Sequence, residues 1–229
     1  VPLGNSATID AALASSHKAF EVTRKMPAFK RSGILHKITV GIENRRRQFV
    51  ETIVAEAGKP VTLADAEVTR AIGTFQVAAD EAKRVMGELL TPDAIAAGEN
   101  HVGSWRRFPT GVIAGITPFN FPLNLVAHKV APAIATGNTI VIKPAPKTPL
   151  TALLLGEVLV EAGIVPGQVN IITCANEIAH LLSEDDRVKH ISFTGSAAVG
   201  WKIKAKSGKK KLTLELGGNA AVIVHRDAD

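Results

Sequence analysis

The sequence has 229 residues, of which 46% are hydrophobic, and its formal net charge is +6 at pH 7. This apolar content supports a folded core and is too high for a disordered chain. The longest apolar runs, such as residues 150–160, are interrupted by Gly and Glu and are too short to span a bilayer. No basic-then-apolar secretion signal opens the sequence. We therefore expect a cytoplasmic protein that has no membrane partner.

The chain contains a single cysteine, Cys174. One cysteine cannot form an intrachain disulfide or a cysteine metal cluster, and we predict no metal site. The positive charge is concentrated at residues 45–47 and 202–211, where solvated helix faces explain it. Because the chain has no tyrosine and only 4% aromatic residues, no stacking platform accompanies this charge. We therefore expect no nucleic-acid partner.

Helical patterns fill the first part of the chain. Residues 9–20 are rich in Ala, and apolar residues recur over 32–57 with a period close to 3.6. Gly58, Lys59 and Pro60 end this second helix. A third helix is predicted over 63–86.

The helical pattern then breaks. Residues 91–100 are polar, and 101–108 alternate weakly, which is typical of an edge strand or of one arm of a hairpin. We divide the chain into N-terminal helices (1–90), a hairpin or oligomerisation arm (91–110) and a sheet-forming region (111–229), on which the helices pack.

Short apolar runs alternate with helical segments from Gly111 onward. Strands are predicted over 112–116, 139–142, 169–172, 190–193, 212–216 and 221–224. Helices are predicted over 123–135, 151–162, 177–182 and 197–205. This alternation indicates an α/β fold with a parallel sheet flanked by helices. In such sheets ligands bind outside the carboxyl ends of the strands.

Unusual residues follow four of these strands. The segments are Thr-Pro-Phe-Asn-Phe-Pro (117–122), Lys-Pro-Ala-Pro (143–146), Phe-Thr-Gly-Ser (193–196) and Glu-Leu-Gly-Gly (215–218). Gly195 permits a close backbone approach, and Ser196 with the following amides could hold a pyrophosphate. By itself, a Gly-Ser pair at a helix start is usually only an N-cap, and the chain has no G-x-G-x-x-G fingerprint.

The order and spacing of these motifs resemble the aldehyde dehydrogenase superfamily. The resemblance is dense from residue 111 to 229 and looser over the preceding helices. It implies a Rossmann-like NAD(P)-binding sheet, a catalytic domain and a small oligomerisation element, of which this chain supplies the first and part of the third. It further implies NAD(P)-dependent oxidation of an aldehyde to its acid through a cysteine thioester, by a homodimer or homotetramer when full length.

The same resemblance assigns two catalytic roles. Asn120 matches the oxyanion donor, although an Asn in a Pro-flanked turn is also common. Glu215 matches the general base, and its strand of alternating Leu suggests a buried carboxylate, which is costly without a function. The family nucleophile lies downstream of residue 229, so this fragment should lack dehydrogenase activity. Cys174 is expected to be a small buried hydrophobe rather than a substitute nucleophile.

The resemblance also predicts the cofactor-binding residues. Lys143 matches the lysine that reaches the adenosine ribose, and Phe119 stands where relatives often carry Trp. Where NAD-preferring relatives carry a ribose-binding Glu, this chain has Pro146, followed by Lys147, which makes a 2′-phosphate tolerable and weights NADP slightly over NAD. The full expected set is Ile116, Thr117, Pro118, Phe119, Lys143, Pro146, Phe193, Thr194, Gly195, Ser196, Val199, Leu216 and Gly217.

Three residues are predicted to contact the substrate. Arg70 stands where some relatives place an arginine that holds a carboxylate or phosphate, and Asn124 and His128 are one turn apart on a helix. The alternative for Arg70 is a surface ion pair with Glu67. We expect a small polar or anionic aldehyde, such as a semialdehyde, a hydroxyaldehyde or a phosphorylated aldehyde.

Two other functions remain open. One is a coenzyme-A-acylating aldehyde dehydrogenase, although the presence of Glu215 favours water as the acceptor. The other is a nucleotide-binding fragment without catalysis.

Overall fold

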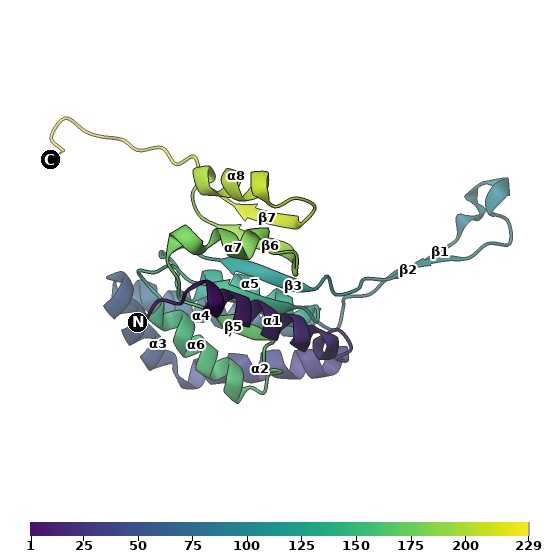
Figure 1. The fold of residues 1–229 in the computed structure, drawn as a ribbon, viewed down its shortest axis with the longest axis horizontal. Helices are drawn as coiled ribbons and strands as arrows, with labels where there is room; N and C mark the ends of the chain where they lie inside the picture. Colours follow the sequence, from purple (N-terminus) through teal and green to yellow (C-terminus); the bar gives the residue numbers. More distant parts are fainter. Residues whose placement is uncertain (229) are drawn as a thin grey trace.

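The computed structural model describes residues 1–228 and contains a five-stranded parallel sheet (Figure 1). The strand order is β5-β4-β3-β6-β7, so the chain crosses over the sheet between non-consecutive neighbours. The central strands are almost fully buried, which explains their continuous apolar sequence. The strands are β3 (Val112–Ile116), β4 (Thr139–Lys143), β5 (Val169–Ile171), β6 (Val188–Thr194) and β7 (Lys211–Glu215).

Helices cover both faces of the sheet. One face packs on α1 (Ser6–Thr23), α7 (His180–Glu184) and α8 (Ala197–Lys206), through a core that includes Ala114 and Phe193. The other face packs on a larger core that includes Ile113 and Ile142. The helices of that core are α2 (Ala28–Asn44), α3 (Arg46–Ala57), α4 (Val61–Glu81), α5 (Asn124–Ala135) and α6 (Leu150–Glu161). We call these two faces the α8 face and the α5 face.

The N-terminal helices differ in detail from the prediction. The first begins earlier, at Ser6, because Asn5 and Thr8 form a reciprocal capping box. The predicted helix 32–57 is two helices, since the backbone leaves the helical conformation at Arg45 (φ −107°, ψ 16°). Arg45 Nη1 donates to Glu157 at 2.8 Å, and the break allows both α2 and α3 to contact α6.

Helix α5 is tied to the N-terminal helices at both ends. Its last carbonyl, that of Ala135, accepts a hydrogen bond from Arg31 Nε of α2 at 2.8 Å. At its beginning, the backbone amides of Leu123 and Asn124 donate to the carboxylate of Glu67 of α4, at 2.9 and 3.1 Å. Groups from distant parts of the chain therefore satisfy the ends that a helix cannot satisfy itself.

A two-stranded arm projects from the body of the molecule (Figure 1). It is formed by β1 (Glu88–Leu90) and β2 (Gly103–Trp105), which pair antiparallel. A hairpin was expected here, but its first strand begins before residue 91. Helix α4 ends at Glu81, earlier than the predicted end near residue 86.

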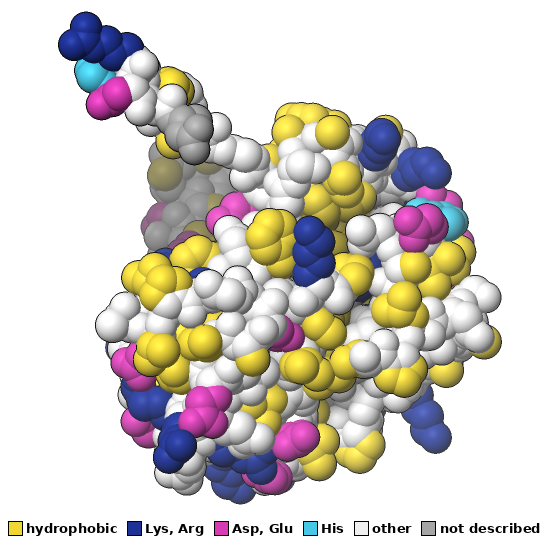
Figure 2. All heavy atoms as spheres, turned by 90° about the vertical axis from the view of Figure 1, so that its left-hand side faces the viewer, with side chains coloured by type: hydrophobic (Ala, Val, Ile, Leu, Met, Phe, Trp, Pro, Cys, Tyr) yellow, Lys and Arg dark blue, Asp and Glu magenta, His cyan; other side chains and the backbone are white. Residues whose placement is uncertain are grey.

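The predicted strand 221–224 is wrong. Val222, Ile223 and Val224 are exposed and pair with no strand within residues 1–228. The segment after β7 runs away from the body, as Figures 1 and 2 show. An apolar run without a neighbouring strand gains neither ladder hydrogen bonds nor burial. No helix of the described chain is long and apolar enough to cross a membrane.

Candidate active site

The sheet register sorts the predicted site residues between the two faces. Ile116 lies beside Lys143 on one side and beside Phe193 on the other, so these three share the α8 face. Thr194 is one residue further along β6 and is in register with Glu215. Because successive side chains of a strand point to opposite faces, Thr194 and Glu215 belong to the α5 face.

Lys143 is the buried cation of the α8 face. Its Nζ donates to Asn176 Oδ1 at 2.9 Å, and burial lowers the pKa of the Lys143 amine. Asn176 belongs to a short 3-10 turn, Asn176–Ile178, that occupies the start of the predicted helix 177–182. It was missed by the sequence analysis, because one Asn in a polar loop carries no distinguishing signal.

The start of α8 fits a phosphate group. A Cβ at Gly195 would lie 2.6 Å from Cζ of Phe193, so any other residue in the turn from β6 into α8 would force this buried ring to shift. The side chain of Ser196 makes no capping hydrogen bond, which leaves the amides of the first turn for a ligand. The hydroxyl of Thr117, in the neighbouring loop, is buried without a partner among residues 1–228. Free donors and an unsatisfied hydroxyl at adjacent strand ends suit a dinucleotide.

The other predicted cofactor residues surround this point. Phe119 is exposed, and Lys147 Nζ lies 5.7 Å from the centre of its ring, which brings the loops after β3 and β4 together. Leu216 packs against Gly200 of α8. A Cβ at Gly200 would lie only 2.3 Å from Cδ2 of Leu216. Residues without a specific contact here are Pro118, Pro146, Val199 and Gly217, of which the last three are exposed.

A chain of hydrogen bonds runs through the α5 face. Thr194 Oγ1 donates to Glu215 Oε2 at 3.1 Å and accepts from Lys129 Nζ at 2.8 Å. Lys129 also donates to Ser192 Oγ at 3.2 Å. Burial lowers the pKa of Lys129 to about 8, against the opposing attraction of Glu215. Lys129 was missed by the sequence analysis, although a lysine within the apolar helix 123–135 was a visible signal.

Glu215 is exposed, so the expectation of a buried carboxylate is wrong. The alternating Leu residues of β7 place apolar side chains on one face of the strand only. The strand lies at the edge of the sheet, and the side chains of Lys211, Thr213 and Glu215 are all exposed. An exposed carboxylate needs no functional justification, so its role depends on its contact with Thr194.

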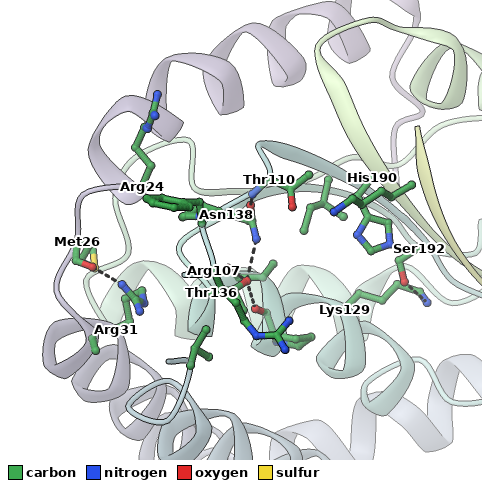
Figure 3. A pocket seen from close by; sticks show the side chains of 18 of the residues that line it. Arg24, Met26, Arg31, Arg107, Thr110, Lys129, Thr136, Asn138, His190 and Ser192 are labelled. Atoms are coloured by element: carbon green, nitrogen blue, oxygen red, sulfur yellow. Dashed lines mark hydrogen bonds between the residues drawn. The ribbon is translucent and has the colours of Figure 1, made fainter. Parts of the chain in front are cut away.

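The far end of this hydrogen-bonded chain opens into a cavity of about 1000 Å³. Lys129, Ser192 and His190 line one part of it, and Arg31 and Arg107 line another (Figure 3). Burial lowers the pKa of His190. A space of this size can hold water that contacts Lys129.

Asn120 is exposed in the loop that joins β3 to α5. Its backbone carbonyl accepts a hydrogen bond from Lys59 Nζ at 2.7 Å. Arg70 lies beside the same loop, with its guanidinium carbon 5.4 Å from the centre of the Phe121 ring. Within residues 1–228 Arg70 has no carboxylate partner within 4.0 Å. Glu67 pairs with Lys59 instead, so the alternative of an Arg70–Glu67 ion pair is wrong.

The other two predicted substrate residues differ in exposure. His128 is exposed. Asn124 is buried, and its Oδ1 accepts from Thr74 of α4 at 3.2 Å. The substrate contacts of Arg70, Asn124 and His128 stay predictions.

Cys174 lies in the core of the α8 face, which confirms its predicted burial. Burial raises the pKa of this thiol, which disfavours the reactive thiolate. Among the described residues, no group of three His, Cys, Asp or Glu side chains is placed to bind a metal ion.

Known proteins resemble this chain over nearly its whole length. The profile of the aldehyde dehydrogenase family matches residues 1–229. The 3-sulfolactaldehyde dehydrogenase of Priestia megaterium is 41% identical over 222 residues, which are 96% of this chain and 46% of that protein.

Two solved structures share the fold. Aldehyde dehydrogenase 21 of Physcomitrella patens, in complex with the reaction product succinate, has a TM-score of 0.93 and 43% identity over 96% of this chain and 46% of its own. Glyceraldehyde-3-phosphate dehydrogenase of Methanocaldococcus jannaschii, complexed with NADP, has a TM-score of 0.90 and 38% identity over 95% of this chain and 48% of its own. The chain spans about half the length of these relatives. With its whole length matched by the family profile, it belongs to the aldehyde dehydrogenase family.

Proposed function

We propose that the full-length protein containing this chain oxidises an aldehyde to a carboxylic acid with NAD(P)⁺, through a cysteine thioester. The observation that carries the proposal is that two polar sites lie on opposite faces of the sheet, both at the carboxyl ends of its strands. Free helix amides and a buried lysine lie on the α8 face, and the chain Glu215–Thr194–Lys129 lies on the α5 face. The nucleophile is supplied from outside residues 1–229, and this fragment alone is therefore inactive.

The α8 face would hold the cofactor, which supplies the hydride acceptor when bound. The first amides of α8 would bind the pyrophosphate, and Lys143 would donate to a ribose hydroxyl. NADP-bound and NAD-dependent enzymes both occur among the structural relatives. Pro146 and Lys147 present no carboxylate to a 2′-phosphate, which supports NADP alongside NAD.

On the α5 face, Glu215 would act as the general base. It removes a proton from the water that attacks the thioester, while Thr194 donates a hydrogen bond to its carboxylate and accepts one from Lys129. With a pKa of about 8, Lys129 is mostly protonated at neutral pH and can act as this donor. Because hydrolysis needs such a base, Glu215 favours water over coenzyme A as the acyl acceptor.

Asn120 would stabilise the oxyanion that forms when the thiolate attacks the aldehyde. Its side-chain N–H is a neutral donor, and it stands at an exposed loop between the two faces. Donors fixed before the reaction stabilise developing charge without the cost of reorganisation.

The substrate would be a small anionic aldehyde. Arg70 is exposed and free of a carboxylate partner among the described residues, close to the Asn120 loop. The relatives named above are described with a sulfonated aldehyde, with succinate and with a phosphorylated aldehyde, all of which carry an anionic group.

The activity is tested with the full-length protein by following reduced nicotinamide in the presence of such aldehydes. Arg70→Ala should raise KM for an anionic aldehyde about tenfold or more, since a charge-assisted hydrogen bond is lost, and should leave an uncharged aldehyde of equal length unaffected. Arg47→Ala, which removes an exposed arginine paired with Glu51, is the matched control. Equal losses on both aldehydes would refute the anion site, and failure to reduce either nicotinamide would refute the activity.

A further inference from the structure

A buried ion pair lies directly behind the Asn120 loop. Lys59 Nζ is 2.6 Å from Glu67 Oε2, and the exposed fractions of the two side chains are 13% and 0%. Removing two charges from water is expensive, and buried ion pairs often add little net stability. Both residues of this pair also contact the backbone of the Asn120 loop or of α5.

Lys59 holds the first part of the loop. Besides its contact with Glu67, its Nζ donates to the backbone carbonyl of Asn120 at 2.7 Å. It also lies 3.9 Å from the centre of the Phe121 ring, within the range of a cation–π contact. One ammonium group therefore fixes two consecutive loop residues.

Glu67 holds the end of the same loop. Its Oε1 accepts hydrogen bonds from the amides of Leu123 and Asn124, while Oε2 accepts from Lys59. Helix α5 has no side-chain cap of its own at this end. A carboxylate at this position also interacts favourably with the positive end of the helix dipole. Glu67 thus caps α5 from a different helix.

From these contacts we propose that Lys59 and Glu67 are positioning residues that aim the Asn120 amide at the oxyanion, an inference that rests on the proposed function. The pair holds the backbone at residue 120 and again at 123–124. The Cα atom from which the Asn120 side chain extends is therefore held in place. Loss of these contacts lets the donor move, and a displacement of about 1 Å can cost about a hundredfold in rate.

The test is a double-mutant cycle in the full-length protein. Lys59→Met keeps the aliphatic stem and removes the ammonium, and should lower kcat about tenfold to a hundredfold with little change in cofactor affinity. In an Asn120→Ala background the same substitution should lower kcat by less than about threefold, because the group that it positions is gone. Lys59→Arg, which retains a charged donor, should recover most of the lost kcat.

Lys206→Met serves as the control, because it removes an exposed lysine that pairs with Glu184 at 3.0 Å. Should Lys59→Met fail to fold, the variant Lys59→Met/Glu67→Gln leaves no unpaired buried charge and enters the same cycle. Equal factors in both backgrounds would overturn the positioning role while leaving the proposed function intact. A normal kcat for Asn120→Ala alone would overturn the oxyanion role of Asn120 and the positioning role with it, whereas only a wild-type protein that oxidises no aldehyde would overturn the proposed function.

Discussion

The α8 face and the α5 face share their strands but present different kinds of polar groups. On the α8 face most donors are backbone amides at the start of α8, and one buried lysine accompanies them. On the α5 face the polar groups are connected side chains, from Glu215 through Thr194 to Lys129 and Ser192. Backbone amides bind an anion whatever side chains they carry, whereas proton transfer depends on particular side chains. Cofactor binding and catalysis should therefore respond differently to substitution.

Substitution of Glu215 on the α5 face should reduce activity most. Glu215→Gln keeps the shape of the side chain but cannot take a proton, so kcat should fall about a hundredfold to ten-thousandfold. The dissociation constant of NAD(P), measured by titration, should not change. Glu184→Gln is the matched control on an exposed carboxylate. Turnover equal to wild type would remove Glu215 from the mechanism, and a parallel loss of cofactor affinity would erase the distinction between the faces.

A smaller effect is expected beside the α8 face. Pro146→Glu places a carboxylate after β4, where it would repel a 2′-phosphate and accept hydrogen bonds from a ribose diol. The ratio of kcat/KM for NADP to that for NAD should fall about tenfold. Pro146→Ala, which adds no charge, should leave this ratio near the wild-type value. An unchanged ratio in the Glu variant would show that this loop does not reach the ribose.

The smallest effect is on stability and concerns Lys129. Its pKa is about 8 in the folded protein and about 10.4 in an unfolded chain, so the unfolded chain binds more protons between these values. The free energy of unfolding should therefore gain a contribution as pH rises from 8 to 10. In thermal unfolding, Lys129→Met should abolish this component, a difference of about 2–4 °C in Tm per kcal/mol. Identical pH profiles for the two proteins would contradict the lowered pKa.

The sheet was predictable because its signal is local. Buried parallel strands are continuous apolar runs, and the glycine of the Phe-Thr-Gly-Ser turn marks a place where a Cβ would collide with Phe193. The sequence did not reveal that β7 is an exposed edge strand or that residues 221–224 pair with no strand. Their exposure depends on which neighbours cover them, and that information is not contained in the segments themselves.

The polar networks were less predictable for the same reason. Lys129, Thr194 and Glu215 are far apart in sequence and meet only because the register aligns Thr194 with Glu215 beneath α5. On an isolated helix, Arg70 would be the natural partner of Glu67, because the two residues are three positions apart. The fold instead supplies Lys59 and two backbone amides, which satisfy a buried carboxylate more completely.

The attachment of α5 at both ends bears on how the molecule unfolds. Glu67 holds its first amides and Arg31 its last carbonyl, so a helix of the sheet region is completed by α4 and α2. If the N-terminal helices detached, α5 would lose both its cap and its apolar cover in one event. The predicted division near residue 90 therefore separates two kinds of secondary structure but not two units that unfold independently. Helices and sheet should melt together, as one thermodynamic unit.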